Sequence, residues 1–194
     1  MMRLEILNRG YKPATKVLFG VIRLFSGHPV PDAAKIVFYR PGFYGDHAKV
    51  FTHEAMRGAS DWSVGDRELM AAYVSKLNES AFCIAAHTAT ARRAYQDGPV
   101  VAAVLDDLES APIDDKLRAT LRMLGKLTVD GTVGADDMRA VLGAGVSRRQ
   151  AEDALAVCAA FNTTGRLADA FGFEVLSEEG MEAGAKYLLQ RGYR

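Results

Sequence analysis

The chain has 194 residues, 49% of them hydrophobic and 25% charged, a composition that excludes disordered, collagen-like and disulfide-rich classes. Its 24 basic and 24 acidic residues give a formal net charge of +0, so no basic surface for nucleic acid is expected. The longest apolar run, residues 16–25, is interrupted by Arg23 and is shorter than the roughly 20 residues that span a bilayer. Only Cys83 and Cys158 are present, which favours the cytoplasm. We expect a cytoplasmic protein that binds neither nucleic acid nor a membrane.

Helical periodicity dominates the first half, and strand alternation is nearly absent from the whole chain. Ser63 to Asp66 has the form of a capping box, which predicts a helix that begins there and continues to about residue 78. A short break around Glu79 separates it from an alanine-rich helix that Gly98 closes. The helices predicted in this half cover residues 14–25, 31–40, 45–57, 63–78 and 81–96.

The second half repeats this pattern. Ser147 and Gln150 form a second capping-box signature, and Pro112 is suited to the first turn of a helix. The helices predicted here cover residues 112–127, 135–142 and 147–170, with a last one after Ser177. The sequence therefore predicts an all-α, multi-helical bundle in a single domain, 1–194. Its halves, 1–110 and 111–194, are compatible with a diverged duplication.

Chemistry is suggested by a cysteine and a histidine on one predicted helix. Cys83 and His87 are four residues apart, so their side chains share a face, and Cys83 lies in the first turn. Free amides and the helix dipole at that position favour a thiolate, with a pKa lowered from about 8.5 towards about 7. Glu68, on the preceding helix, is placed to orient or deprotonate His87. The spacing alone is weak evidence, and it favours a buried cysteine beside a surface histidine.

A family resemblance favours the chemical interpretation. Its motif comprises Arg67, Glu68, Leu69, Val74, Ser75, Asn78, Cys83 and His87. This motif resembles the alkylhydroperoxidase D-like branch of the carboxymuconolactone decarboxylase superfamily, most closely its peroxidase-related members. Similar segments at 38–41, 112–127 and 161–170 extend the resemblance over most of the chain. It implies an all-helical fold, a homo-oligomer (trimer or hexamer), and Cys83 as the thiol that attacks peroxide, with Glu68 and His87 as its acid–base relay.

One position departs from the family pattern. Where the family has the first cysteine of a Cys-x-x-Cys pair, this chain has Ser80. A hydroxyl can donate a hydrogen bond, but it cannot form the disulfide that completes the dithiol cycle. Reduction of the sulfenic acid formed on Cys83 would then need an external thiol. Ser80 is also a favoured helix N-cap, whose hydroxyl could bind the amide of Cys83 instead.

Three functions remain open. The first is a thiol-dependent peroxidase-like oxidoreductase acting on hydroperoxides, the second a non-redox decarboxylase- or lactone-type enzyme using Glu68 and His87, and the third a non-catalytic oligomeric relative. No cofactor and no metal are expected, because His47 and His53 lack metal-ligand spacing. Cys158 is assigned to the core, and Tyr73 is assigned to helix packing, with reach of its hydroxyl to the site as the alternative. In the first hypothesis the Glu68 carboxylate acts in the relay and lies outside the core, so Glu68→Gln slows the reaction and leaves folding nearly intact.

Overall fold

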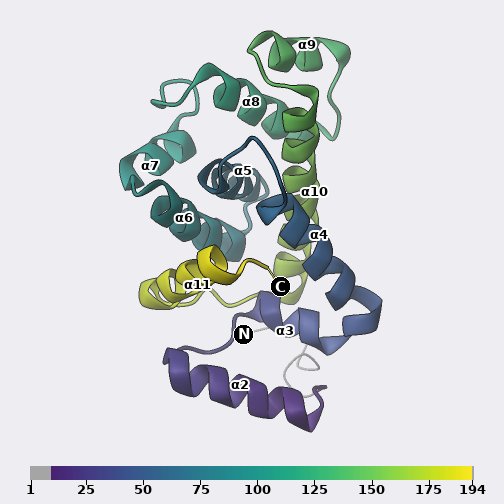
Figure 1. Cartoon of the computed structure of the whole chain (residues 1–194), viewed down its shortest axis with the longest axis vertical. Coiled ribbons are helices and arrows are strands. Elements are labelled where there is room, and N and C mark those ends of the chain that lie inside the picture. Colours follow the sequence, from purple (N-terminus) through teal and green to yellow (C-terminus); the bar gives the residue numbers. More distant parts are fainter. Residues whose placement is uncertain (1–9, 194) are drawn as a thin grey trace.

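The computed structural model describes residues 10–193, which form α-helices joined by short loops, with no strand in that range. The predicted all-α fold is confirmed. The helices are α2 (Pro13–Ser26), α3 (Asp32–Tyr39), the π-helix η1 (Pro41–Gly45), α4 (Asp46–Arg57), α5 (Val64–Leu77), α6 (Ala81–Tyr95), α7 (Gly98–Asp106), α8 (Asp115–Asp130), α9 (Ala135–Gly143), α10 (Arg148–Phe171) and α11 (Glu178–Arg191) (Figure 1).

Helix α5 lies at the centre of the molecule, with α4, α6, α7, α8 and α10 around it (Figure 1). Most of its residues are buried, Arg67, Glu68 and Ser75 included. A helix surrounded in this way needs apolar side chains on nearly all sides. An apolar stripe on one helix face would instead indicate a helix at the surface. Three polar side chains in its buried set therefore each need a partner.

The turn between α5 and α6 sets the geometry of the site. Glu79 adopts the left-handed conformation, with φ of 56°, and reverses the chain so that α6 runs back along α5. The amide of Ser80 donates to the carbonyl of Ser75 at 3.1 Å, which closes the turn. The predicted break around Glu79 is confirmed, and it places Glu68 beside the middle of α6.

Both predicted capping boxes are present. The hydroxyl of Ser63 accepts from the amide of Asp66 at 3.0 Å, and that of Ser147 accepts from the amide of Gln150 at 3.1 Å. Helix α8 begins later than predicted, because Asp114 caps it by accepting from the amide of Leu117 at 2.7 Å. Helix α7 was not predicted, nor was η1.

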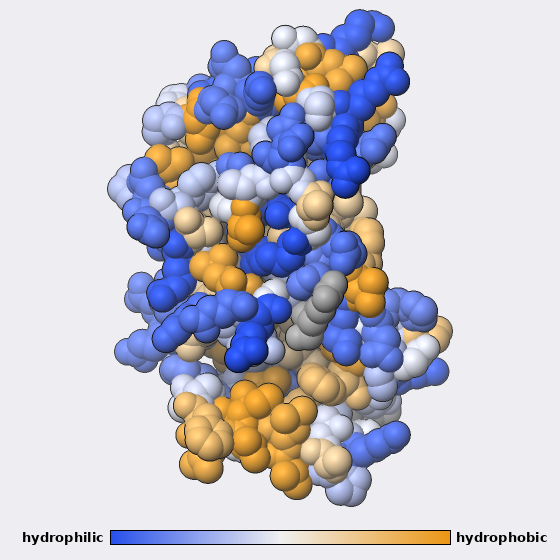
Figure 2. Space-filling view, in the orientation of Figure 1, coloured by the Kyte–Doolittle hydropathy of each residue, from blue (hydrophilic) through white to orange (hydrophobic). Residues whose placement is uncertain are grey.

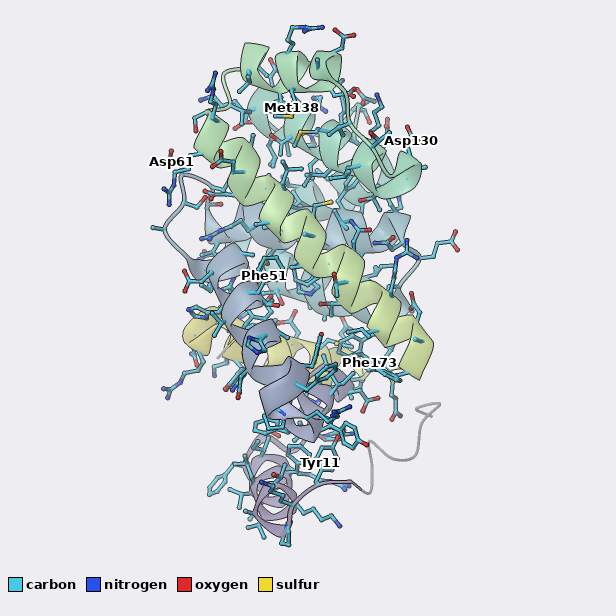
Figure 3. The ribbon with its side chains drawn as sticks, turned by 90° about the vertical axis from the view of Figure 1, so that its right-hand side faces the viewer. Tyr11, Phe51, Asp61, Asp130, Met138 and Phe173 are labelled. Atoms are coloured by element: carbon cyan, nitrogen blue, oxygen red, sulfur yellow. The ribbon has the colours of Figure 1, made fainter. Side chains whose placement is uncertain are left out.

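The buried side chains form two clusters. The larger surrounds α5 and includes Leu69, Leu124 and Phe161. The smaller packs α6 against the segment after α10 and includes Cys83 and Phe173. Figure 3 shows α10 running diagonally across the molecule and α2 at one end, below Tyr11.

Helix α2 contributes no buried residue. Its exposed apolar side chains, called here the α2 apolar surface, are Val17, Leu18, Val21, Ile22, Leu24 and Phe25. Figure 2 shows them as a hydrophobic area at the end of the molecule where α2 lies. Within residues 10–193, no helix combines the length and apolar character needed to cross a bilayer.

Candidate active site

Glu68 of α5 and His87 of α6 form a buried pair. His87 Nδ1 lies 2.8 Å from Glu68 Oε2, and the two residues are 5% and 0% exposed. The antiparallel packing of α5 on α6 makes this contact. The sequence-based expectation that Glu68 lies close enough to orient His87 agrees with this distance.

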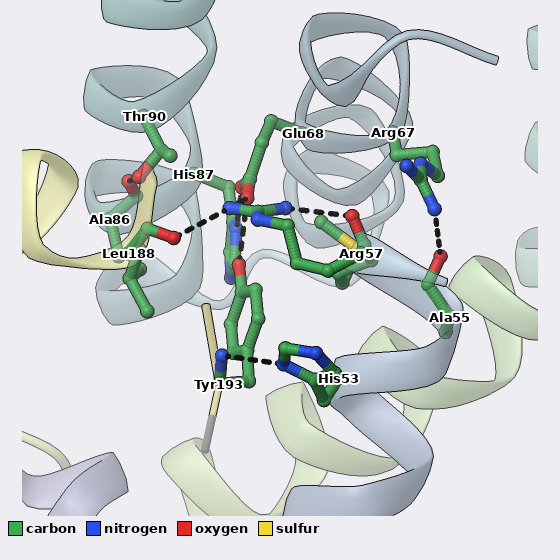
Figure 4. Close-up of polar contacts among 11 residues, drawn as sticks. His53, Ala55, Arg57, Arg67, Glu68, Ala86, His87, Thr90, Leu188 and Tyr193 are labelled. Atoms are coloured by element: carbon green, nitrogen blue, oxygen red, sulfur yellow. Dashed lines mark hydrogen bonds and ion pairs between the residues drawn. The ribbon is translucent and has the colours of Figure 1, made fainter. Parts of the chain in front are cut away.

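Two further residues, neither of them predicted from the sequence, also hydrogen-bond to the carboxylate of Glu68 (Figure 4). Arg57, the last residue of α4, donates from its guanidinium to Glu68 Oε1 at 2.6 Å. The hydroxyl of Tyr193, at the end of the described chain, donates to the same oxygen at 2.9 Å. Three donors from three separate segments therefore meet on one carboxylate.

This environment determines the charge of Glu68. Burial by itself raises the pKa of its carboxyl group, but the hydrogen bond and charge of His87 and then those of Arg57 outweigh it. The net result is a pKa below the ordinary value, so Glu68 is ionised at neutral pH. The expectation that Glu68 lies outside the core is wrong, because its side chain is fully enclosed and is the counter-ion of Arg57.

The ionised carboxylate also fixes the proton on His87. An ionised carboxylate can only accept hydrogen bonds, so Nδ1 carries a proton and donates it to Glu68 in the neutral imidazole as well as in the imidazolium. The other ring nitrogen, Nε2, is then the basic one. Phe161 packs edge-on against the imidazole with ring centroids 4.2 Å apart, which holds the ring in place.

Cys83 lies one helical turn before His87 on α6, with about 6 Å expected between their Cβ atoms. Its thiol is 1% exposed, and its polar neighbours are Ser80 and Asp169. Burial raises the pKa of the thiol to about 11, with the Ser80 hydrogen bond acting against the shift and the Asp169 carboxylate adding to it. The predicted lowering of this pKa is wrong, because desolvation outweighs the N-terminal field of α6.

Ser80 is the N-cap residue of α6, but its side chain does not cap the helix. The hydroxyl is oriented as a donor to two acceptors on α10. Asp169 Oδ1 lies 3.0 Å away, and the carbonyl oxygen of Gly165 lies 3.4 Å away. The predicted hydrogen bond from the amide of Cys83 to this hydroxyl is therefore absent. Ser80 instead ties the start of α6 to α10 and lies beside the thiol.

The remaining candidates lie away from this site. Cys158 is buried in the larger cluster, against Thr128 and Asn162, as predicted for a core residue, and neither cysteine is in a disulfide. Tyr73 lines a hollow of about 480 Å³ between α5, α8 and the loop after α7, and none of the four predicted site residues lines it. His47 lines a smaller hollow of about 230 Å³ between α4 and α10.

Comparisons with known proteins identify the fold. No protein-family model matches the sequence, and no curated protein matches it. The structure is similar to that of an uncharacterized peroxidase-related protein from Silicibacter sp. TM1040, with a TM-score of 0.79 and 23% identity over 94% of this chain and 95% of that one. A second similar structure, described as an alkylhydroperoxidase AhpD core, is an uncharacterized peroxidase-related protein from Ralstonia eutropha JMP134, with a TM-score of 0.77 and 21% identity over 94% of this chain and 96% of that one. The chain therefore has the helical fold of these peroxidase-related proteins.

Proposed function

We propose that the protein is a thiol-dependent, peroxidase-like oxidoreductase that reduces hydroperoxides through the single cysteine Cys83. The observation that carries the proposal is the buried Glu68–His87 pair, one helical turn from that thiol. The likeness to peroxidase-related structures supports the same reaction class. Cys83, His87, Glu68 and Ser80 are the residues proposed to act.

In the proposed reaction, Nε2 of His87 accepts the thiol proton as the sulfur of Cys83 attacks the terminal oxygen of the hydroperoxide. The O–O bond breaks, an S–O bond forms, and the sulfur is oxidised by two electrons to a sulfenic acid. The leaving alkoxide takes the proton back from the imidazolium and departs as an alcohol. Glu68 stabilises the imidazolium charge through Nδ1.

The raised thiol pKa makes this proton transfer necessary. With a pKa of about 11, only about one Cys83 in 10⁴ is a thiolate at pH 7. A thiol in that state hardly reacts with peroxide unless a base removes its proton during the attack. His87 is the base nearest along α6, which is why its role is central to the proposal.

The sulfenic acid must be reduced by an external thiol. Ser80 cannot form a disulfide with Cys83, and Cys158 belongs to the other buried cluster. Two equivalents of a thiol reductant would return Cys83 to the thiol, with release of water and a disulfide of the reductant. We therefore propose a small hydroperoxide as substrate and a thiol compound or thiol protein as electron donor.

The experiment that tests this function is treatment with one equivalent of cumene hydroperoxide in the presence of dimedone. Mass spectrometry is expected to find the dimedone adduct on Cys83 and none on Cys158. Excess peroxide is expected to carry Cys83 on to the sulfinic acid. Cys158→Ser is the matched control and should behave like the wild type. Cys83 that remains a free thiol under these conditions would contradict the peroxidase proposal.

One observation favours a second candidate. The Glu68–His87 pair is fully assembled, whereas burial raises the pKa of the Cys83 thiol to about 11 and keeps it protonated at neutral pH. A non-redox enzyme of the decarboxylase or lactone type would need only the pair. Activity of that kind would survive Cys83→Ala, which separates it from the first proposal.

We further propose a cytoplasmic homo-oligomer, a trimer or hexamer. The α2 apolar surface supports it, because contiguous exposed apolar side chains commonly mark contacts between protein chains. The cytoplasmic location rests on the two free cysteines.

A further inference from the structure

The end of the chain enters the site. Helix α11 stops at Arg191, and Gly192 adopts the left-handed conformation with φ of 69°. This turn directs Tyr193 back into the molecule, between α4 and α6 (Figure 4). The two residues are called here the C-terminal turn.

Glycine is required at the hinge of the C-terminal turn. Any other side chain is strained at this φ, and a Cβ atom on Gly192 would lie only 2.7 Å from the ring of His53. The amide of Tyr193 donates to Nδ1 of His53 at 3.3 Å. The backbone of the turn is therefore fitted closely against α4.

The phenol of Tyr193 is bound on two sides. Its hydroxyl donates to Glu68 Oε1 at 2.9 Å, and the guanidinium of Arg57 lies 5.1 Å from the ring centre. Burial raises the pKa of the phenol well above its ordinary value, and the carboxylate of Glu68 adds to this. Tyr193 therefore keeps its proton at neutral pH and donates it to Glu68.

Arg57 is held in turn by the same end of the chain. It donates to the carbonyl of Leu188 in α11 at 3.1 Å and to that of Met56 at 2.8 Å. Its remaining bond goes to Glu68 Oε1, the oxygen that Tyr193 binds. One carboxylate oxygen is thus occupied by two fixed donors, and the other is left to His87.

This division of the carboxylate orients the imidazole. Rotation of the carboxylate would break the bonds of Oε1 to Arg57 and Tyr193, and Oε2 faces Nδ1 of His87 at 2.8 Å. The ring of Tyr193 is also nearly parallel to the imidazole, at 18°, with centroids 6.4 Å apart. We propose that Tyr193 is a positioning residue, which acts through Glu68 to hold His87 in the Nδ1–H tautomer with Nε2 free as the base.

This inference concerns the proposed site, and only its rate measurement rests on the proposed function. The direct test is ¹⁵N NMR of the histidine ring nitrogens at pH 8, where a neutral imidazole shows which nitrogen carries the proton. Wild-type His87 is expected to be the Nδ1–H tautomer alone. Tyr193→Phe removes one hydroxyl and keeps the ring, and is expected to raise the Nε2–H form to about 10% or more of the molecules.

The matched control is Tyr187→Phe, which removes the hydroxyl of an exposed tyrosine on α11 and should leave the His87 signals unchanged. If the protein oxidises Cys83 with peroxide, Tyr193→Phe is also expected to slow that step about tenfold, and Tyr187→Phe is not. A protein without peroxidase activity would fail the rate measurement in every variant, and the tautomer measurement would still decide the role of Tyr193.

Two results would overturn the inference. One is wild-type His87 in the Nε2–H form, a measurement that needs no variant. The other is a folded Tyr193→Phe protein in which His87 keeps the Nδ1–H tautomer as completely as the wild type. Tyr193 would then only anchor the chain end.

Discussion

Replacing Glu68 with glutamine is expected to lower the free energy of unfolding by about 3–5 kcal/mol. The carboxylate is fully buried and is the counter-ion of Arg57 at 2.6 Å, so its removal leaves an enclosed guanidinium without a negative partner. In the wild type, three donors share the two carboxylate oxygens of Glu68, and these donors belong to Arg57, Tyr193 and His87. The amide of glutamine offers them only one acceptor oxygen. Urea unfolding followed by circular dichroism measures the loss.

Glu182→Gln is the control for this prediction. Glu182 pairs with Arg93 at 3.5 Å on the surface, and both side chains are nearly half exposed. Its replacement is expected to change the free energy of unfolding by less than about 1 kcal/mol. Equal effects of the two substitutions would show that the Glu68 cluster contributes no more than a surface ion pair.

The lowered pKa of Glu68 predicts how the difference in free energy of unfolding between the wild type and Glu68→Gln depends on pH. A carboxyl group with a lowered pKa in the folded state contributes its full stabilisation above about pH 4.5, and loses it as the pH falls through the folded value. The gap in stability between the wild type and Glu68→Gln is therefore expected to be constant near neutral pH and to narrow in acid. A gap that widened in acid would contradict the ionised state of Glu68.

The variant Ser80→Cys is expected to form a disulfide between position 80 and Cys83 in nearly all molecules, whereas the wild type forms none there. Positions 80 and 83 are three residues apart at the start of α6, and two cysteines so placed can reach disulfide geometry. One equivalent of hydroperoxide should oxidise Cys83, and the new thiol should then displace water from the sulfenic acid. Mass spectrometry should find a loss of two hydrogens and no dimedone adduct.

The control variant is Ser80→Cys combined with Cys83→Ser, which should form no internal disulfide. The loss of the Ser80 hydroxyl is tolerated, because its partner Asp169 is exposed to water. A Ser80→Cys protein that still gave the sulfenic acid adduct and no disulfide would show that the two side chains cannot meet. The prediction that a cysteine at position 80 can resolve the sulfenic acid of Cys83 would then be wrong.

The main features of the fold follow from local sequence. Capping boxes at Ser63 and Ser147 set two helix starts, and the break at Glu79 brings α6 back along α5, so the contact between Glu68 and His87 is foreseeable. Helix α7 also has a local signal in the sequence at its start. Asp97 caps it by accepting from the amide of Val100 at 3.2 Å, and Pro99 follows in the first turn, where proline is favoured.

Other parts of the site depend on packing that no local pattern contains. Arg57 and Tyr193 reach Glu68 from the end of α4 and from the end of the chain, and neither has a spacing that relates it to the motif. The pKa of Cys83 depends on burial against α10 and Phe173, which outweighs the helix-start effect that a sequence rule describes. Local rules predict most of the helices and the Glu68–His87 pair, and tertiary contacts determine the electrostatics of the site.

His87 is proposed to activate the thiol of Cys83. The most direct measurement of this role is the pH dependence of Cys83 oxidation by hydroperoxide, compared between the wild type and His87→Asn. At pH 7 the wild type is expected to react about 100-fold faster, because asparagine cannot accept the thiol proton. The variant should accelerate only as the thiol itself ionises, with a rate that rises towards pH 11. Equal rates and superimposable pH profiles in the two proteins would contradict the account.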